Sequence, residues 1–226
     1  MHRFTSTLFS LLLWVFPGQV HAQDFSSDAF DAKAYVSDLN VVAEIWKQGE
    51  LSNADVSVIA SVGCGLVRKV AADELLLNTA NWFETVEYPE PNVIQETGIE
   101  EFVAFEVAEF RKAGATDAAI ALVEQALFDR VSMPLEAPFI DKDLLIESDV
   151  ESSFCNARFL GGVDPNAPAG EAEVFLAAAA TDVIVGTTTI AIDVLISMGS
   201  GGMAAGIMTI LSGGVGYDLI KKGLGG

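Results

Sequence analysis

The side chains that could do chemistry in this chain are mostly carboxylates, because histidine and cysteine are scarce. The sequence holds 32 aspartates and glutamates, two histidines and two cysteines. Both histidines, His2 and His21, precede a signal-peptide cleavage site that we predict after Ala22. The processed chain would contain no imidazole, which excludes Ser-His-Asp and Cys-His catalysis and histidine-dependent metal sites. We therefore predict no catalytic residue of these kinds, no metal ion and no cofactor.

Cys64 and Cys155 are the two cysteines, and both lie beyond the predicted cleavage site. Export would place them in an oxidising compartment, where two cysteines usually form a disulfide. The alternative is a pair of buried free thiols, because Cys64 lies in an apolar run. A reactive thiolate is disfavoured without histidine, although Arg68 and Lys69 follow about one helical turn later.

A paired-carboxylate hydrolase stays open on residue type alone. One group of glutamates lies near aromatic residues, which could form an apolar pocket and raise a carboxyl pKa. A solvated helix face is the simpler interpretation of the same pattern. The glutamates are Glu84, Glu87, Glu100, Glu101, Glu106 and Glu109, and the aromatic residues are Trp82, Phe83, Phe102, Phe105 and Phe110.

Charge excludes some binding functions. The net charge of −20 disfavours binding to nucleic acid, because phosphate backbones would be repelled. The acidic run between 141 and 151 could hold Ca²⁺, but it lacks the alternating ligands and central glycine of an EF-hand, so we interpret it as a solvated face. The glycine-rich stretch 199–202 lacks the lysine of a phosphate-binding loop.

The N-terminus indicates export. Arg3 precedes an apolar run from Leu8 to Phe16, and small residues flank the predicted cleavage site at the end of 1–22. The apolar run is too short to span a bilayer, although a retained N-terminal anchor is the alternative. We expect a protein of the periplasm or cell envelope of a bacterial-type cell, or an extracellular one.

Helical periodicity then dominates, and it predicts an all-α fold. Apolar residues recur every three or four positions from Asp31 to Gly49, from Ser52 toward Phe83, from Ile99 to Ala113, and from Asp117 to Val131. The pairs Ser52/Asp55 and Thr97/Glu100 suit N-terminal capping boxes, Thr116 suits an N-cap, and Gly49 and Gly114 are natural stops. A further short helix is predicted around 144–155.

The predicted helices form an acidic helical domain that we place at 23–165. The composition of the chain changes after this domain. Residues 166–170 close a Gly/Pro-rich stretch that we interpret as a linker, and 171–226 form a glycine-rich hydrophobic, membrane-seeking segment. Within it, Glu171 to Ser197 is predicted to be one helix, or a helix followed by an extended run.

The last stretch, Val194 to Tyr217, has 24 residues without a charge, long enough to cross a bilayer. Its glycines would let helices pack closely, and two lysines beyond it suit a membrane flank. We predict helix packing at Gly199, Gly202, Gly206, Gly213 and Gly214, and a membrane flank at Lys221 and Lys222.

Three arrangements of the C-terminal segment are open. It could be a single anchor over 194–217, a helical hairpin that turns near 198–202, or a pair of buried helices in a soluble protein. In the hairpin, Asp182 and Asp193 would face protein or water. The apolar–turn–apolar order resembles the hydrophobic hairpin of pore-forming bacteriocins, as a similarity of pattern only.

The leading functional hypothesis is a non-enzymatic envelope protein that its C-terminal segment holds at a membrane, with the acidic domain as an interaction module. The second is a secreted membrane-active protein, pore-forming or inserting, with a latent hydrophobic hairpin. The third is a carboxylate-dependent hydrolase. Membrane lipid is the expected partner under the first two hypotheses, and any protein partner is open.

Overall fold

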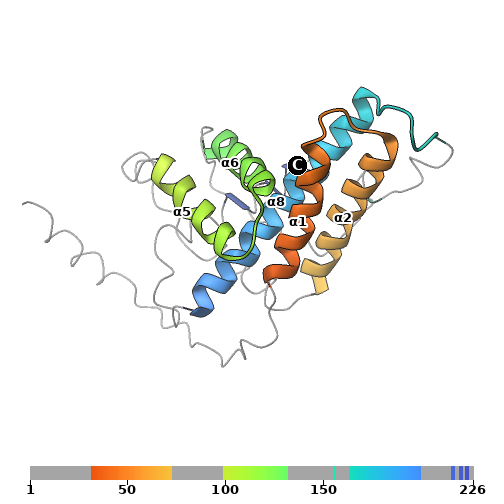
Figure 1. Ribbon diagram of the computed structural model, residues 1–226. Helices are drawn as coiled ribbons and strands as arrows, with labels where there is room; N and C mark the ends of the chain where they lie inside the picture. The colour runs from red at the N-terminus through yellow and green to blue at the C-terminus, as the bar shows by residue number, and fades with distance from the viewer. Residues whose placement is uncertain are drawn as a thin grey trace, which may run out of the picture.

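The fold is all-helical in the computed structural model of this chain (Figure 1). The structure describes residues 32–72, 99–131, 155, 163–199, 215–216, 219–220 and 222–223. The helices in these ranges are α1 (Ala32–Trp46), α2 (Asn53–Ala72), α5 (Ile99–Lys112), α6 (Asp117–Val131) and α8 (Glu171–Gly199). Over the same ranges there is no strand, and the predicted all-α fold is confirmed.

Helices α1 and α2 form a hairpin whose ends follow the sequence signals. Gly49 adopts φ +90°, a conformation that suits glycine, and it ends the turn after α1. At the start of α2, the Ser52 backbone N–H and hydroxyl both donate to the Asp55 carboxylate, and the Asp55 N–H donates to Ser52 Oγ at 3.2 Å. The predicted capping box is therefore present, and the hydrogen bonds from Ser52 lower the pKa of Asp55.

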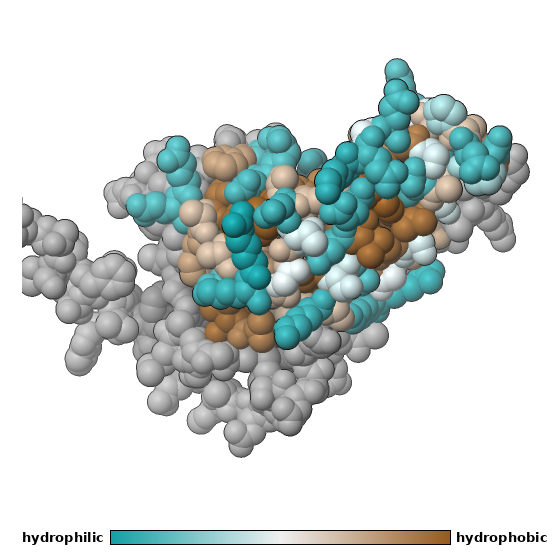
Figure 2. Space-filling view, in the orientation of Figure 1, coloured by the Kyte–Doolittle hydropathy of each residue, from teal (hydrophilic) through white to brown (hydrophobic). Residues whose placement is uncertain are grey.

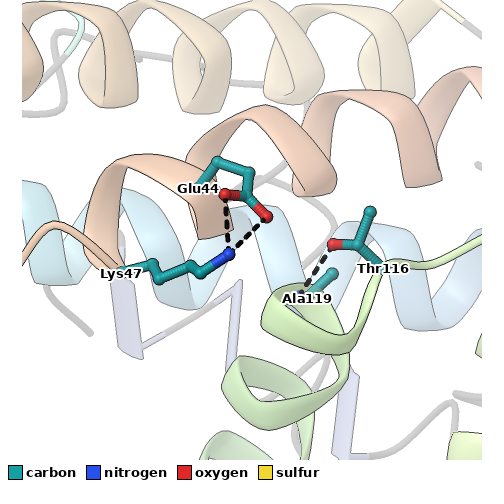
Figure 3. A network of polar contacts seen from close by, with 4 residues as sticks. All are labelled: Glu44, Lys47, Thr116 and Ala119. Carbon is teal, nitrogen blue, oxygen red and sulfur yellow. Dashed lines mark hydrogen bonds and ion pairs between the residues drawn. The ribbon is translucent and has the colours of Figure 1, made fainter.

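Helices α5 and α6 form a second hairpin, closed by Gly114 at φ +100°. The Thr116 hydroxyl accepts a hydrogen bond from the Ala119 N–H at 3.2 Å, as an N-cap does (Figure 3). Asn40 of α1 clamps this turn, because its amide donates to the Gly114 carbonyl and accepts from the Thr116 N–H. Figure 3 also shows the ion pair at the end of α1, between Glu44 and Lys47, which directly follows the helix.

Helix α8 runs through the middle of the bundle, with contacts to α1, α2, α5 and α6 (Figure 1). Its residues 183–194 are all buried, and the apolar side chains among them belong to the same hydrophobic cluster as the apolar faces of the other four helices. Polar side chains cover much of the outer face of these helices, with apolar residues showing between them (Figure 2). The C-terminal apolar helix is therefore the core of the bundle.

The stretch before α8 is ordered against the start of α2. The carbonyls of Ala167 and Pro165 accept hydrogen bonds from the backbone N–H groups of Asn53 and Ala54 at 3.0 and 2.9 Å. These are N–H groups that a helix start leaves without an intrahelical partner. The predicted linker thus completes the cap of α2, while the division of the chain into domains on either side of it stays a prediction.

Several sequence predictions lie outside the described residues. They are the signal peptide, Thr97 of the second capping box, the continuation of α2 toward Phe83, and most of the short helix at 144–155. Of the two possibilities for 171–197, the single helix is correct, since α8 continues to Gly199 through the β-branched stretch. Tertiary burial of that stretch outweighs its preference for strand.

Candidate functional site

The candidate site is the apolar helical pair that α8 forms with residues near the C-terminus. Among the described residues, one helix is long and apolar enough, by length and composition, to cross a bilayer: Glu171–Ile196. In the bundle 78% of its most apolar stretch is buried. The core helix of a water-soluble protein can have the same composition, so what distinguishes this helix has to come from its contacts.

Contacts with α1 and α2 hold the first half of α8. A Cβ atom placed on Gly63 of α2 would lie 3.2 Å from Ala180 Cβ, so the two helices approach closely at this point. The Trp46 indole N–H donates to Thr181 Oγ1 at 2.8 Å, and the Thr181 hydroxyl donates to the Ala177 carbonyl at 2.7 Å. These contacts join α8 to the hairpin of α1 and α2.

A glycine seam joins α8 to the C-terminal helical residues, which are 215, 216, 219, 220, 222 and 223. A Cβ atom on Gly216 would lie 2.9 Å from the Gly186 carbonyl oxygen, and one on Gly223 would collide with the Ala179 carbonyl oxygen. Gly216 contacts Gly186, and Gly223, seven residues later, contacts Ala179, seven residues earlier. The two segments therefore run antiparallel. An antiparallel pair is expected both for the helical hairpin and for the pair of buried helices, and only glycine allows backbones this close.

An ion pair crosses the same seam. Lys222 Nζ lies 2.9 Å from Asp182 Oδ2, and the Asp182 side chain is 19% exposed. Burial raises the pKa of Asp182 in the bundle, the Lys222 ammonium opposes that shift, and Asp129 of α6 adds to it. The half-buried carboxylate is thus matched by one lysine from the opposing segment.

The interior of α8 also holds polar groups. Thr188 and Thr189 are buried, and their hydroxyls donate to the carbonyls four residues earlier, at 2.7 and 2.9 Å. This backbone bonding satisfies a hydroxyl where water is absent. Thr187 Oγ1 is buried without a hydrogen-bond partner, and Asp193 is fully buried.

The structure describes some of the predicted site residues, and others lie outside the described residues. Cys64 and Cys155 form a disulfide, which links α2 to a position 91 residues later. Lys222 is exposed and pairs with Asp182, and Gly199 is the last residue of α8. The predicted roles of the glycines and lysines in a membrane stay predictions. Outside the described residues lie Gly202, Gly206, Gly213, Gly214 and Lys221.

The glutamates proposed for hydrolysis do not gather in one place that the structure describes. Glu100 and Glu101 are exposed, Glu109 pairs with Lys112, and Glu106 is fully buried on α5. Glu84, Glu87 and the acidic run between 141 and 151 lie outside the described residues. In the part of the chain that the structure describes, no group of three potential metal ligands occurs.

Comparison with protein families, curated proteins and solved structures found no match. The function therefore has to be argued from the contacts of the chain itself.

Sequence reasoning missed the residues that make the seam. Gly186 lies in a β-branched stretch for which a helix and an extended run were both open, and Asp182 was expected to face protein or water without a named partner. One available signal was the seven-residue spacing of Gly216 and Gly223, which puts both on one helical face. Their partners on α8 could not be deduced without the register of the two segments.

Proposed function

We propose that this protein is an exported, non-enzymatic, membrane-active helical bundle, in which α8 and the C-terminal helical residues form a stored apolar hairpin. In the water-soluble form the hairpin is the core of the bundle, and at a membrane it transfers into the lipid. The observation that carries the proposal is a helix of bilayer length that packs on a second helical segment through a glycine seam, beneath helices whose outer faces carry many polar side chains. The predicted signal peptide supports export.

Burial of α8 favours this proposal over a permanent anchor. A helix held in lipid from the start has no need of a covering layer, because lipid already solvates its apolar face. Here α1 and α2 pack along α8, and the Trp46–Thr181 hydrogen bond closes the contact. A separate anchor between Val194 and Tyr217 stays a possibility that membrane fractionation would detect.

The test is a lysine placed where the two environments differ. Ala178 of α8 is exposed in the bundle and lies within the bilayer-length span, so Ala178→Lys is tolerated in water and opposed in lipid. Ala121 of α6 is also exposed, and Ala121→Lys is the matched control outside the hairpin. A lysine costs about 3 kcal/mol at the centre of a bilayer helix, and Ala178 lies nearer one end of the 26-residue span, so this value is an upper limit for Ala178→Lys.

The measurement is dye release from vesicles of neutral lipid, beside thermal unfolding of each variant. We expect wild type and Ala121→Lys to release dye equally, and Ala178→Lys to release it up to about a hundredfold less well, one factor of ten for each 1.4 kcal/mol. All three should unfold at similar temperatures. Equal release by all three, or no release by wild type, would contradict the proposal.

Salt-washed membrane fractions separate this proposal from the permanent anchor. A stored hairpin predicts full-length protein in the soluble fraction until vesicles are added. An anchor predicts that it pellets from the start. Truncation at Gly170 is a poor control for either, because it removes the helix that forms the core of the bundle.

A further inference from the structure

We infer that the hairpin acts as a preassembled pair: α8 and the C-terminal helical residues stay packed on each other at the membrane, and the interface that opens is the one between α8 and α2. The inference rests on the proposed function, because it specifies which contacts break when the hairpin leaves the bundle. Three features of the two interfaces support it.

The first feature is the kind of contact at the glycine seam. Gly186 meets Gly216, and Gly223 meets Ala179, with backbone atoms of both segments in close approach. Close backbone packing gains dispersion energy, and this gain does not depend on excluding water. The seam is therefore as favourable among lipid tails as it is within the bundle.

The second feature is the ion pair. Asp182 and Lys222 are 2.9 Å apart across the seam, and together they carry no net charge. If the two segments separated in lipid, each charge would be left alone in an apolar medium, which is costly. The same attraction strengthens as the dielectric constant falls, so the pair opposes separation most strongly inside a membrane.

The third feature is the contrast with the covering helices. The cover of α8 by α1 and α2 buries apolar side chains such as Val36, Leu39 and Ile59, and the drive for that burial comes from water. Lipid tails replace such contacts without loss. One hydrogen bond, from Trp46 to Thr181, and one close approach, of Gly63 to Ala180, add to this cover. Thr181 keeps its bond to Ala177 without Trp46, and no ion pair among the described residues joins α2 to α8.

Two engineered disulfides test the inference on the full chain. Ile190→Cys with Gly216→Cys bridges the seam, where a Cβ on residue 216 lies 3.2 Å from Ile190 Cγ1, close to where the sulfur introduced at position 190 would lie. That Cβ also lies 2.9 Å from the Gly186 carbonyl oxygen in the cysteine and serine variants alike, so thermal unfolding first verifies that both fold. Gly63→Cys with Ala180→Cys bridges α2 and α8, where the Cβ atoms lie 3.2 Å apart, within a few tenths of an ångström of disulfide geometry. Peptide mapping verifies that each bridge forms beside the native one.

Each cysteine pair is compared with the same pair of serines, so that only the covalent bond differs. We expect vesicle dye release by the seam-bridged protein to match that of its serine pair. Release by the α2–α8-bridged protein should fall at least about tenfold below its serine pair, because the bond holds the closed state together.

The opposite pattern would overturn the inference: loss of release on bridging the seam, with release retained on bridging α2 to α8. Loss with both bridges would also overturn it, since the seam would then have to open as well. Absence of release by wild type is a different result, and it would reject the proposed function rather than the order in which the contacts open.

Discussion

Replacing Gly186 with alanine tests whether the C-terminal residues are seated on α8 as described. The added Cβ would collide with the Gly216 carbonyl oxygen and lie 3.0 Å from the Ile220 nitrogen, both of them backbone atoms that cannot move independently. Overpacking of this kind costs about 3 kcal/mol at its upper typical value. Alanine regains about 1 kcal/mol of helix propensity, which leaves a net loss of about 2 kcal/mol.

Gly65→Ala is the matched control. Gly65 also lies inside a helix, α2, but a Cβ there has nothing within 4 Å. The same substitution should therefore raise stability by about 1 kcal/mol through helix propensity alone. The same substitution, glycine to alanine, is expected to change stability in opposite directions at the two positions. Comparing them therefore separates the clash at residue 186 from any general effect of adding a methyl group.

The assay is thermal unfolding followed by circular dichroism at neutral pH. For a chain of this size 1 kcal/mol corresponds to about 2–4 °C, so Gly186→Ala should unfold about 4–8 °C below wild type and Gly65→Ala about 2–4 °C above it. If Gly186→Ala instead raised the midpoint as Gly65→Ala does, no backbone would lie against residue 186, and the seam would be wrong.

Two further predictions concern Asp182 and the disulfide. Burial raises the folded-state pKa of Asp182 above 3.8, so the folded chain binds this proton more tightly than the unfolded chain. Wild type should therefore gain stability relative to Asp182→Asn as pH falls from neutral to below 3.8. Urea titrations at several pH values measure this difference in stability, and a difference that is constant with pH would contradict the prediction. Cys64→Ser removes the disulfide between positions 91 residues apart and should lower the free energy of unfolding by about 4–5 kcal/mol in the chain-entropy model. Urea unfolding without reductant measures this loss. An unchanged midpoint would show that the disulfide does not constrain the unfolded chain.

Local signals in the sequence predicted the local structure well. Gly49 and Gly114 end their turns, Ser52 and Asp55 form the capping box, and Thr116 caps α6, each because the residue type carries its own backbone preference. The limits of α1, α5 and α6 follow from apolar spacing of three and four. These features depend on residues only a few positions apart.

Long-range partners could not be predicted in the same way. Trp46 lies within the apolar repeat predicted from Asp31 to Gly49, yet its hydrogen bond reaches Thr181, 135 residues later. The predicted linker 166–170 lies directly before α8, and its docking on α2 depends on tertiary position. The pairing of Gly186 with Gly216 needs the register of two segments, which no local pattern encodes.

The docking of the linker on α2 has a consequence for how the chain would fold in the export that we propose for it. The amide of Asn53 donates to the Asp164 carbonyl, 111 residues later, and the first N–H groups of α2 also take their acceptors from this stretch. A chain that emerges N-terminus first therefore cannot complete the start of α2 until most of its length has crossed. Contacts this distant in sequence slow folding. We expect the emerging chain to stay unfolded, in the form that a secretion channel transports, until its C-terminal third arrives.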